Sequence, residues 1–125
     1  MAIARDTTAA NIKPLDGAIV RRHICGTTVA VGEIVSLQSD GYVDPSDATA
    51  SDEAIGIALQ AGVITNTIDV VCIGPVNCLT GATPGKTVFN STTAGEPTET
   101  DSGNTTAIGW AESATVLFVY PEHLA

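Results

Sequence analysis

The chain has 125 residues, enough for one domain with one hydrophobic core. Its formal net charge is −9, and residues 23–125 contain Lys86 as their one basic residue. So acidic a body disfavours nucleic acid and anionic membrane as partners. It has no run of about 18 apolar residues, which predicts no transmembrane helix. The first residues lack the apolar stretch of a secretory signal, so we expect synthesis in a cytoplasm.

The composition favours β-structure. The chain contains 17 Thr, 12 Val and 11 Ile, against six Leu. β-Branched side chains lose rotamer freedom against a helical turn but pack well on a pleated sheet. No segment keeps an apolar spacing of 3.6 residues. We therefore predict an all-β protein, a small β-barrel or β-sandwich.

Residues 1–16 are predicted to form an extended N-terminal arm. Pro14 forbids a helix through that point. The first 22 residues carry four basic and two acidic side chains, so this end is basic, unlike the body. The arm is either a solvated tail or a segment that docks on a partner.

The remaining residues, 17–125, are predicted to form a single β domain whose strands are separated by turn residues. Asp40-Gly41 predicts a hairpin, and Gly74-Pro75 predicts a break between two strands. The predicted strands, in chain order, are Ala18–Cys25, residues 29–37 (a turn and then a strand), Tyr42-Val43, Ala54–Leu59, Ile68–Ile73, Val76–Leu79, Lys86–Phe89, Ile108–Glu112 and Thr115–Tyr120.

Two short motifs recur at the same offset. Gly32-x-x-Val35 recurs as Gly85-x-x-Val88, and Ala54-Ile55-Gly56-x-Ala58 recurs as Ala107-Ile108-Gly109-x-Ala111, each 53 residues later. Glycine before a strand indicates a positive-φ turn, and glycine within a strand indicates the close approach of another backbone. We infer two pseudo-repeated halves, at about residues 29–76 and 82–121.

Residues 81–87, Gly-Ala-Thr-Pro-Gly-Lys-Thr, resemble a phosphate-binding P-loop. The P-loop has four residues between its glycines, whereas this segment has three, and no helix is predicted after it. The repeat explains the segment better, because Gly85-Lys86 matches the turn at Gly32-Glu33. We therefore predict no nucleotide cofactor.

The cysteines are predicted to be buried free thiols. Their number is odd, and a thiol in an apolar strand packs as a small hydrophobe. His23 and Cys25 are expected to share a face, but no third group is present to orient a catalytic dyad. A zinc site is disfavoured because His23 and His123 are the only histidines and no Cys-x-x-Cys pair occurs. The cysteines are Cys25, Cys72 and Cys78.

Carboxylates gather in two predicted loops. They could bind calcium or form an acid pair for hydrolysis, but the EF-hand spacing is missing, and a solvated acidic surface is the preferred interpretation. The one tryptophan, Trp110, is predicted to lie in the core or at a subunit interface. The carboxylates are Asp44, Asp47, Asp52 and Glu53 in one loop and Glu96, Glu99 and Asp101 in the other.

Most of the chain, about residues 17–120, resembles the small capsid-decoration (cement) proteins of tailed phages. In that family a Gly-x-x-Val strand start alternates with an Ile-Gly-x-Ala strand. The segments that carry the resemblance are Gly32–Leu37, Asp40–Val43, Ala54–Ala58, Val70-Val71, Gly74–Val76, Leu79–Phe89, Ala94-Gly95 and Ala107–Ala111.

The resemblance implies a non-enzymatic homotrimer on the outside of a phage head, where it bridges neighbouring major capsid proteins. It implies no catalytic residue, no cofactor and no small-molecule substrate. An N-terminal segment often grips the shell or a neighbouring copy in this family. We predict a partner interface that contains Arg5, Lys13, Arg21, Arg22 and Trp110.

Two other functions are considered. A phage tail or fibre module that binds a glycan would need exposed aromatic side chains, such as Trp110 with Tyr42 or Tyr120. A hydrolase would use the acidic loops, and we rank it last.

Overall fold

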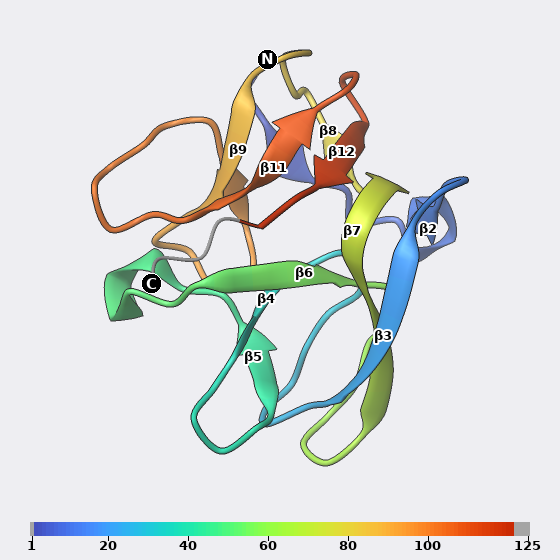
Figure 1. Ribbon diagram of the computed structural model, residues 1–125, viewed down its shortest axis with the longest axis vertical. Helices are drawn as coiled ribbons and strands as arrows, with labels where there is room; N and C mark the ends of the chain where they lie inside the picture. Colours follow the sequence, from blue (N-terminus) through green and yellow to red (C-terminus); the bar gives the residue numbers. More distant parts are fainter. Residues whose placement is uncertain (1, 122–125) are drawn as a thin grey trace.

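The computed structural model describes residues 2–121, and these form strands, turns and two short 3₁₀ helices (Figure 1). The prediction of an all-β protein is confirmed. The elements are β1 (Ala4–Arg5), η1 (Ala9–Asn11), β2 (Lys13–Pro14), β3 (Ile19–Ile24), β4 (Ile34–Leu37), β5 (Val43–Pro45), η2 (Ala48–Ala50), β6 (Ala54–Ala58), β7 (Thr67–Asn77), β8 (Leu79–Thr80), β9 (Thr87–Asn90), β10 (Pro97–Thr98), β11 (Ala107–Ala111) and β12 (Val116–Val119).

One large antiparallel sheet of ten strands curls into a half-barrel (Figure 1). Its order is β10-β9-β11-β12-β7-β6-β4-β5, and β2 and β3 both add to β7. A second sheet contains only β1 and β8. The large sheet therefore places β7 at its centre.

The predicted strand break at Gly74-Pro75 is wrong, because β7 runs without interruption through both residues. Its first part pairs with β3 and β6, and its last part pairs with β2 and β12. Pro75 lies opposite Phe118, and its carbonyl accepts a hydrogen bond from the Leu15 N–H at 2.9 Å. A strand tolerates proline where the ladder does not need its N–H. Strand β7 thus joins the two halves.

The repeat inferred from the sequence is present in the strand pairing. Strand β4 pairs with β5 and β6 in the first half, as β9 pairs with β10 and β11 in the second. The ladders β4–β6 and β9–β11 share one register, including a bulge at the same place. The equivalent pairs are Ile34↔Ile57 and Thr87↔Trp110, Val35↔Gly56 and Val88↔Gly109, and Ser36↔Ala54 and Phe89↔Ala107.

The turns that open the two ladders are also equivalent. Gly32 and Gly85 both have φ +84°, a conformation that glycine adopts without steric cost. The Gly32 N–H donates to the Ala58 carbonyl at 2.7 Å, and the Gly85 N–H donates to the Ala111 carbonyl at 2.8 Å. Each turn therefore ties the start of one strand to the end of the next.

The glycines inside β6 and β11 allow a neighbouring backbone to approach closely. A Cβ atom added to Gly56 would collide with the Val71 carbonyl oxygen, and one added to Gly109 would collide with the Phe118 carbonyl oxygen. The second motif of the repeat is thus needed for strand packing.

Two cysteines also take equivalent places in the repeat. Cys25 and Cys78 are 53 residues apart, and both are fully buried. The Cys25 N–H donates to the Asn66 carbonyl at 2.8 Å, and the Cys78 N–H donates to the Thr115 carbonyl at 3.0 Å. The repeat therefore includes positions outside the motifs from which it was inferred.

The buried apolar residues form two clusters. The first contains Cys25 and residues of the first half, whereas the second contains residues of both halves. Four positions of the first cluster have equivalents 53 residues later in the second. They are Cys25 and Cys78, Val29 and Ala82, Val35 and Val88, and Ala58 and Ala111.

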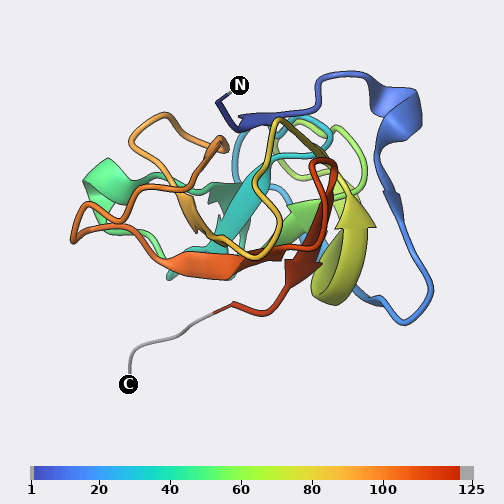
Figure 2. The ribbon, with the colours of Figure 1, turned by 90° about the horizontal axis from the view of Figure 1, so that it is seen from above.

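Residues 2–16, here named the strap, do not form a free arm. Strand β1 pairs with β8, the Asp6 N–H donates to the Cys78 carbonyl at 2.9 Å, and Ile12 is buried in the second cluster. Figure 2 shows the strap starting on the opposite side of the molecule from β11 and passing around its flank. The prediction of an extended arm is not confirmed, because the strap contains η1 and is part of the folded body.

Candidate interaction surface

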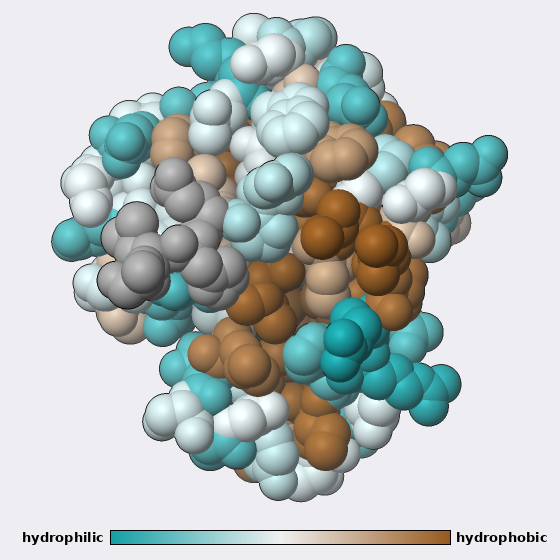
Figure 3. All heavy atoms as spheres, viewed as in Figure 1, coloured by the Kyte–Doolittle hydropathy of each residue, from teal (hydrophilic) through white to brown (hydrophobic). Residues whose placement is uncertain are grey.

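The exposed apolar side chains are concentrated around β3. Seven of the eleven large apolar residues exposed among residues 2–121 lie on β3, on β7 opposite it, or in turns hydrogen-bonded to Ala18 and Cys25, the residues that flank β3. Figure 3 shows brown, apolar atoms gathered over the middle of one face, beside strongly polar ones. We name the seven exposed residues around β3 the β3 patch. Its residues are Leu15, Ile19, Val20, Ile24, Val63, Ile64 and Ile73.

The position of β3 in the sheet explains this exposure. The strand pairs with β7 along one edge, and no described strand pairs with its other edge. Five of its six residues are exposed, and His23 is half-buried. The Arg22 side chain is 78% exposed and lies 3.4 Å from the Asp69 carboxylate. Charged residues on an open edge limit unspecific strand pairing.

A second exposed surface lies on the outer side of β11 and β12, and we name it the aromatic face. Trp110 pairs across the strands with Phe118, and the two rings stack with centroids 4.7 Å apart and planes 11° apart. Tyr120 lies 6.0 Å from Trp110, tilted by 32°. Thr87 pairs with Trp110 on the other side. Trp110 is 40% exposed and Tyr120 is 62% exposed.

The five predicted interface residues do not form one site. Arg5 is half-buried and paired with Glu96, whereas Lys13 is exposed on β2. Arg21 and Arg22 are exposed on β3, and Trp110 belongs to the aromatic face. The sequence analysis missed the apolar residues of the β3 patch. Their pattern is that of a buried strand, so only the position of β3 at an edge reveals them.

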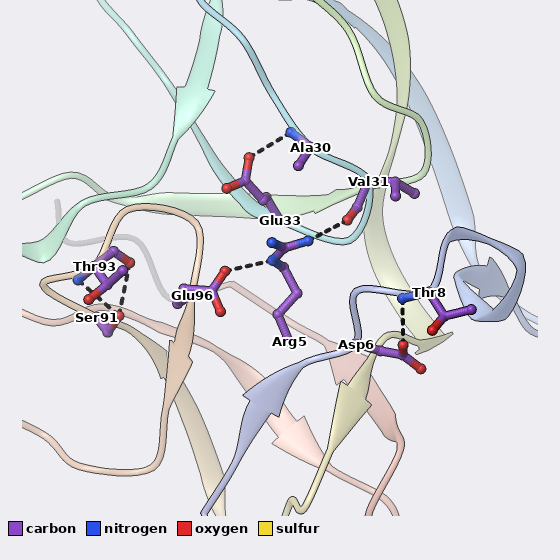
Figure 4. Close-up of polar contacts among 9 residues, drawn as sticks. All are labelled: Arg5, Asp6, Thr8, Ala30, Val31, Glu33, Ser91, Thr93 and Glu96. Carbon is purple, nitrogen blue, oxygen red and sulfur yellow. Dashed lines mark hydrogen bonds and ion pairs between the residues drawn. The ribbon is translucent and has the colours of Figure 1, made fainter.

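Arg5 ties the strap to the body of the protein (Figure 4). Its Nε lies 2.6 Å from Glu96 Oε2, and its Nη1 donates to the Val31 carbonyl at 2.9 Å. The Glu33 carboxylate accepts a hydrogen bond from the Ala30 N–H at 2.7 Å. Burial raises the pKa of Glu33. The hydrogen bond from the Ala30 N–H and the charge of Arg5 act in the opposite direction, and the charge of Glu96 raises the pKa further. Arg5 is thus committed to contacts within the chain.

Several loop carboxylates have structural partners. Asp47 accepts from the Thr49 N–H at 2.8 Å at the start of η2, and Glu99 accepts from the Thr83 N–H at 2.7 Å. Asp101 accepts from the Gly103 N–H at 3.1 Å, which lowers the pKa of the aspartate. These contacts stabilise turns.

Asp44 differs from the other loop carboxylates. Its Oδ1 is buried without a hydrogen-bond partner in the described structure, and burial, with smaller contributions from Asp40 and Asp52, raises its pKa. It borders an open hollow that is also lined by Asp47 and Asp52. No group of three or more His, Cys, Asp or Glu in residues 2–121 has an arrangement that could hold a metal ion.

The thiols are free, as predicted, but one of them is only half-buried. Cys25 and Cys78 are buried, whereas Cys72 is half-buried. Burial raises the pKa of all three thiols. Burial and, to a lesser extent, Arg21 lower the pKa of His23. His123 lies outside the described residues.

The P-loop-like segment leads into a strand. Residues 87–90 after Gly85-Lys86 form β9, so no helix N-terminus follows to bind a phosphate.

No protein-family model matches the chain, and no curated protein matches it at a significant level. Neither 3₁₀ helix, nor any other part of residues 2–121, forms a helix long and apolar enough to span a membrane.

Proposed function

We propose that the protein is a non-enzymatic capsid-decoration (cement) protein. It would bind the outer surface of a tailed-phage head and stabilise contacts between major capsid proteins. The observation that carries this proposal is the β3 patch, an unpaired strand edge surrounded by exposed apolar side chains. Such a surface suits a protein partner better than a small ligand.

A strand edge can bind an extended segment of another protein through main-chain hydrogen bonds. Contiguous exposed apolar surface is typical of protein–protein contact sites. Val20, Arg22 and Ile24 alternate along β3, and together they offer apolar contacts and one positive charge to such a segment. The expected partner segment is therefore extended, with apolar and acidic side chains.

A capsid lattice repeats the same site many times, so weak contacts add up when several copies are linked. The homotrimer and the position on the virion are included in the proposal because the sequence resembles decoration proteins. The proposal includes no cofactor, small-molecule substrate, nucleic acid or membrane as a partner.

The test is sedimentation of the purified protein with phage heads that lack it. A double variant, Arg22→Glu with Ile24→Glu, should bind at least about tenfold more weakly, a loss of roughly 1.4 kcal/mol. Leu37→Glu is the matched control, because Leu37 is exposed to a similar degree but lies outside the β3 patch. Equal binding by the double variant, with its fold intact by circular dichroism, would contradict the proposal.

The exposed aromatic residues favour a second candidate function, a tail or fibre module that binds a glycan. A sugar stacks on a free ring face, however, and Phe118 takes one face of Trp110. A glycan screen with Trp110→Ala as control tests this candidate. Binding that the variant loses would support it over the capsid proposal.

A further inference from the structure

The two halves meet at a junction in which the first half covers the core of the second. Six residues of the second buried cluster form this junction. Three lie on the outer face of the first half, and the other three lie on the last part of β7 and on the second half. All six are at most 1% exposed. The first three are Ile34, Ile57 and Val71, and the other three are Val76, Ile108 and Val119.

The outer residues of this junction have exposed counterparts in the second half. Ile57 pairs with Ile34 on one side and Val71 on the other. In the second half, Trp110 pairs in the same way with Thr87 and Phe118. Thr87 and Trp110 are exposed and Phe118 is half-buried. The aromatic face of the second half is therefore equivalent to the outer face of the first half, which the second half covers.

The covering residues have counterparts as well, and these lie at an open end of the first half. Leu117 and Val70 lie opposite the equivalent residues Ala111 and Ala58, so the strand register makes the pair Val76↔Leu117 correspond to Arg21↔Val70. This register differs by two residues from the offset of 53 that relates Cys25 to Cys78. Two residues further along the same strands, Val119 corresponds to Cys72, and Ile108 corresponds to Ile55 at the offset of 53. We name the set Arg21, Ile55 and Cys72 the open end.

The open end is accessible where its counterparts are fully buried. Arg21 is exposed, and Ile55 and Cys72 are half-buried against the first cluster. Arg21 lies close enough to Cys72 to affect the pKa of its thiol. One chain thus carries both sides of a second junction, and both sides are uncovered.

We propose that the aromatic face of one copy docks on the open end of another copy, repeating between chains the junction found within the chain. The inference rests on the association of copies in the proposed function and names the surfaces that make it. Trp110 takes the place of Ile57, and the Arg21 guanidinium can lie against its ring in a cation–π contact. The two surfaces differ, so the contact is head-to-tail and can close into a ring.

The occupant is a second copy rather than a foreign protein, because the chain already contains a surface built to cover this face. The known cover of the first outer face is a half of this same chain. The open end is the counterpart of that cover in the first half.

The first test is the solution mass from light scattering, run beside the head-binding assay. The wild type should have a mass of at least two chains, a multiple of 12.7 kDa. Trp110→Glu should reduce the mass to that of one chain, because it places a charge in the junction. Leu37→Glu is the matched control, because Leu37 is exposed and apolar but lies outside the aromatic face, the open end and the β3 patch, and it should keep the wild-type mass.

A monomeric wild type, or a Trp110→Glu variant that keeps the full mass, would overturn the proposal. Head binding is measured separately, so a monomer that still binds heads refutes this junction and leaves the proposed function standing.

The second test uses the native Cys72 and does not depend on a destabilising charge. Phe118→Cys treated with a short bismaleimide should give covalent chains of two or more copies. Cys25 and Cys78 are buried and should not react. The control Phe118→Cys with Cys72→Ser should lose these products. Products that persist in the control, or that never form, would contradict the proposed pairing.

Discussion

The two halves share one strand pattern but differ in what covers them. In the first half, Ile57 on β6 is buried by the second half, whereas its counterpart Trp110 on β11 is exposed. Cys25 forms an isolated parallel β-bridge with Val43 in the first half. The counterpart of Cys25 is Cys78, whose carbonyl instead accepts a hydrogen bond from the Asp6 N–H of the strap at 2.9 Å.

This difference shows that the backbone pattern alone does not decide which surfaces are closed. The glycines fix the turns and the strand approach in both halves, while the side chains at equivalent positions decide what each half contacts. The outer face of the first half is covered by the second half. The second half is covered on one side by the strap, and its aromatic face stays exposed.

The strongest test of the equivalence is Gly56→Ala compared with Gly109→Ala. Both should destabilise the protein by about 3 kcal/mol or more in urea unfolding, because the new Cβ would collide with a backbone carbonyl. Gly85→Ala should cost only about 1 kcal/mol, since no atom lies near its Cβ position and only its positive φ is unfavourable. Equal costs at all three glycines would break the comparison.

The next test separates the two outer faces. Ile57→Ala leaves a cavity in a full core and should cost about 3 kcal/mol. Trp110→Ala should cost about 1 kcal/mol in the isolated chain, mainly the lost ring contact with Phe118. Urea unfolding at a concentration that favours single chains measures both. A larger loss for Trp110→Ala than for Ile57→Ala would show that the faces are not buried as described.

A double-mutant cycle measures how much the second half depends on the strap. Arg5→Met, Glu96→Gln and the double variant should give a coupling energy of about 1 kcal/mol, because the ion pair is only partly exposed. A salt titration provides the control, since partly buried pairs are screened less than exposed ones. A coupling near zero would mean that Arg5 does not fasten the strap.

The smallest expected effect is a pH dependence at the first turn. Folding raises the pKa of Glu33 above 4.5, so the folded state holds its proton more tightly than the unfolded chain does. The wild type therefore loses stability, relative to Glu33→Gln, as pH rises from below 4.5 through the folded pKa. Over that range the free energy of unfolding of the wild type should fall by less than about 1 kcal/mol relative to that of Glu33→Gln, measured by thermal unfolding from pH 4 to 7.

Lys86→Met is the matched control for that experiment. Lys86 takes the place of Glu33 in the second turn, and its substitution removes no carboxyl group. A wild type that gains stability relative to Glu33→Gln as pH rises would contradict the raised pKa of Glu33.

Sequence patterns were sufficient for the longer strands, the hairpin at Gly41 and the repeat, because these depend on local turn chemistry and on residue periodicity. They missed the two-residue strands β1, β2 and β10. They failed at Gly74-Pro75, where neighbouring strands tolerate a proline in the middle of β7. They also failed for the strap, because Ile12 is a single apolar residue in a polar segment and its burial depends on the distant second cluster.

The candidate surface was predicted only in part. Arg21, Arg22 and Trp110 were identified from charge and residue type, and they do lie at the surface. The exposed apolar residues of the β3 patch could not be found, because Ile19 and Val20 have the composition of a buried strand. Which strand lies at an edge is decided by long-range pairing, and a local pattern carries no information about it.

The most direct test of the account is the temperature at which phage heads rupture, measured with and without saturating protein. A structural partner that binds only intact heads must stabilise them. Heads with the wild-type protein should therefore rupture at a higher temperature than bare heads, and the variant carrying Arg22→Glu and Ile24→Glu should lose most of that gain. Heads that rupture at the same temperature with and without the wild-type protein would contradict the proposed function.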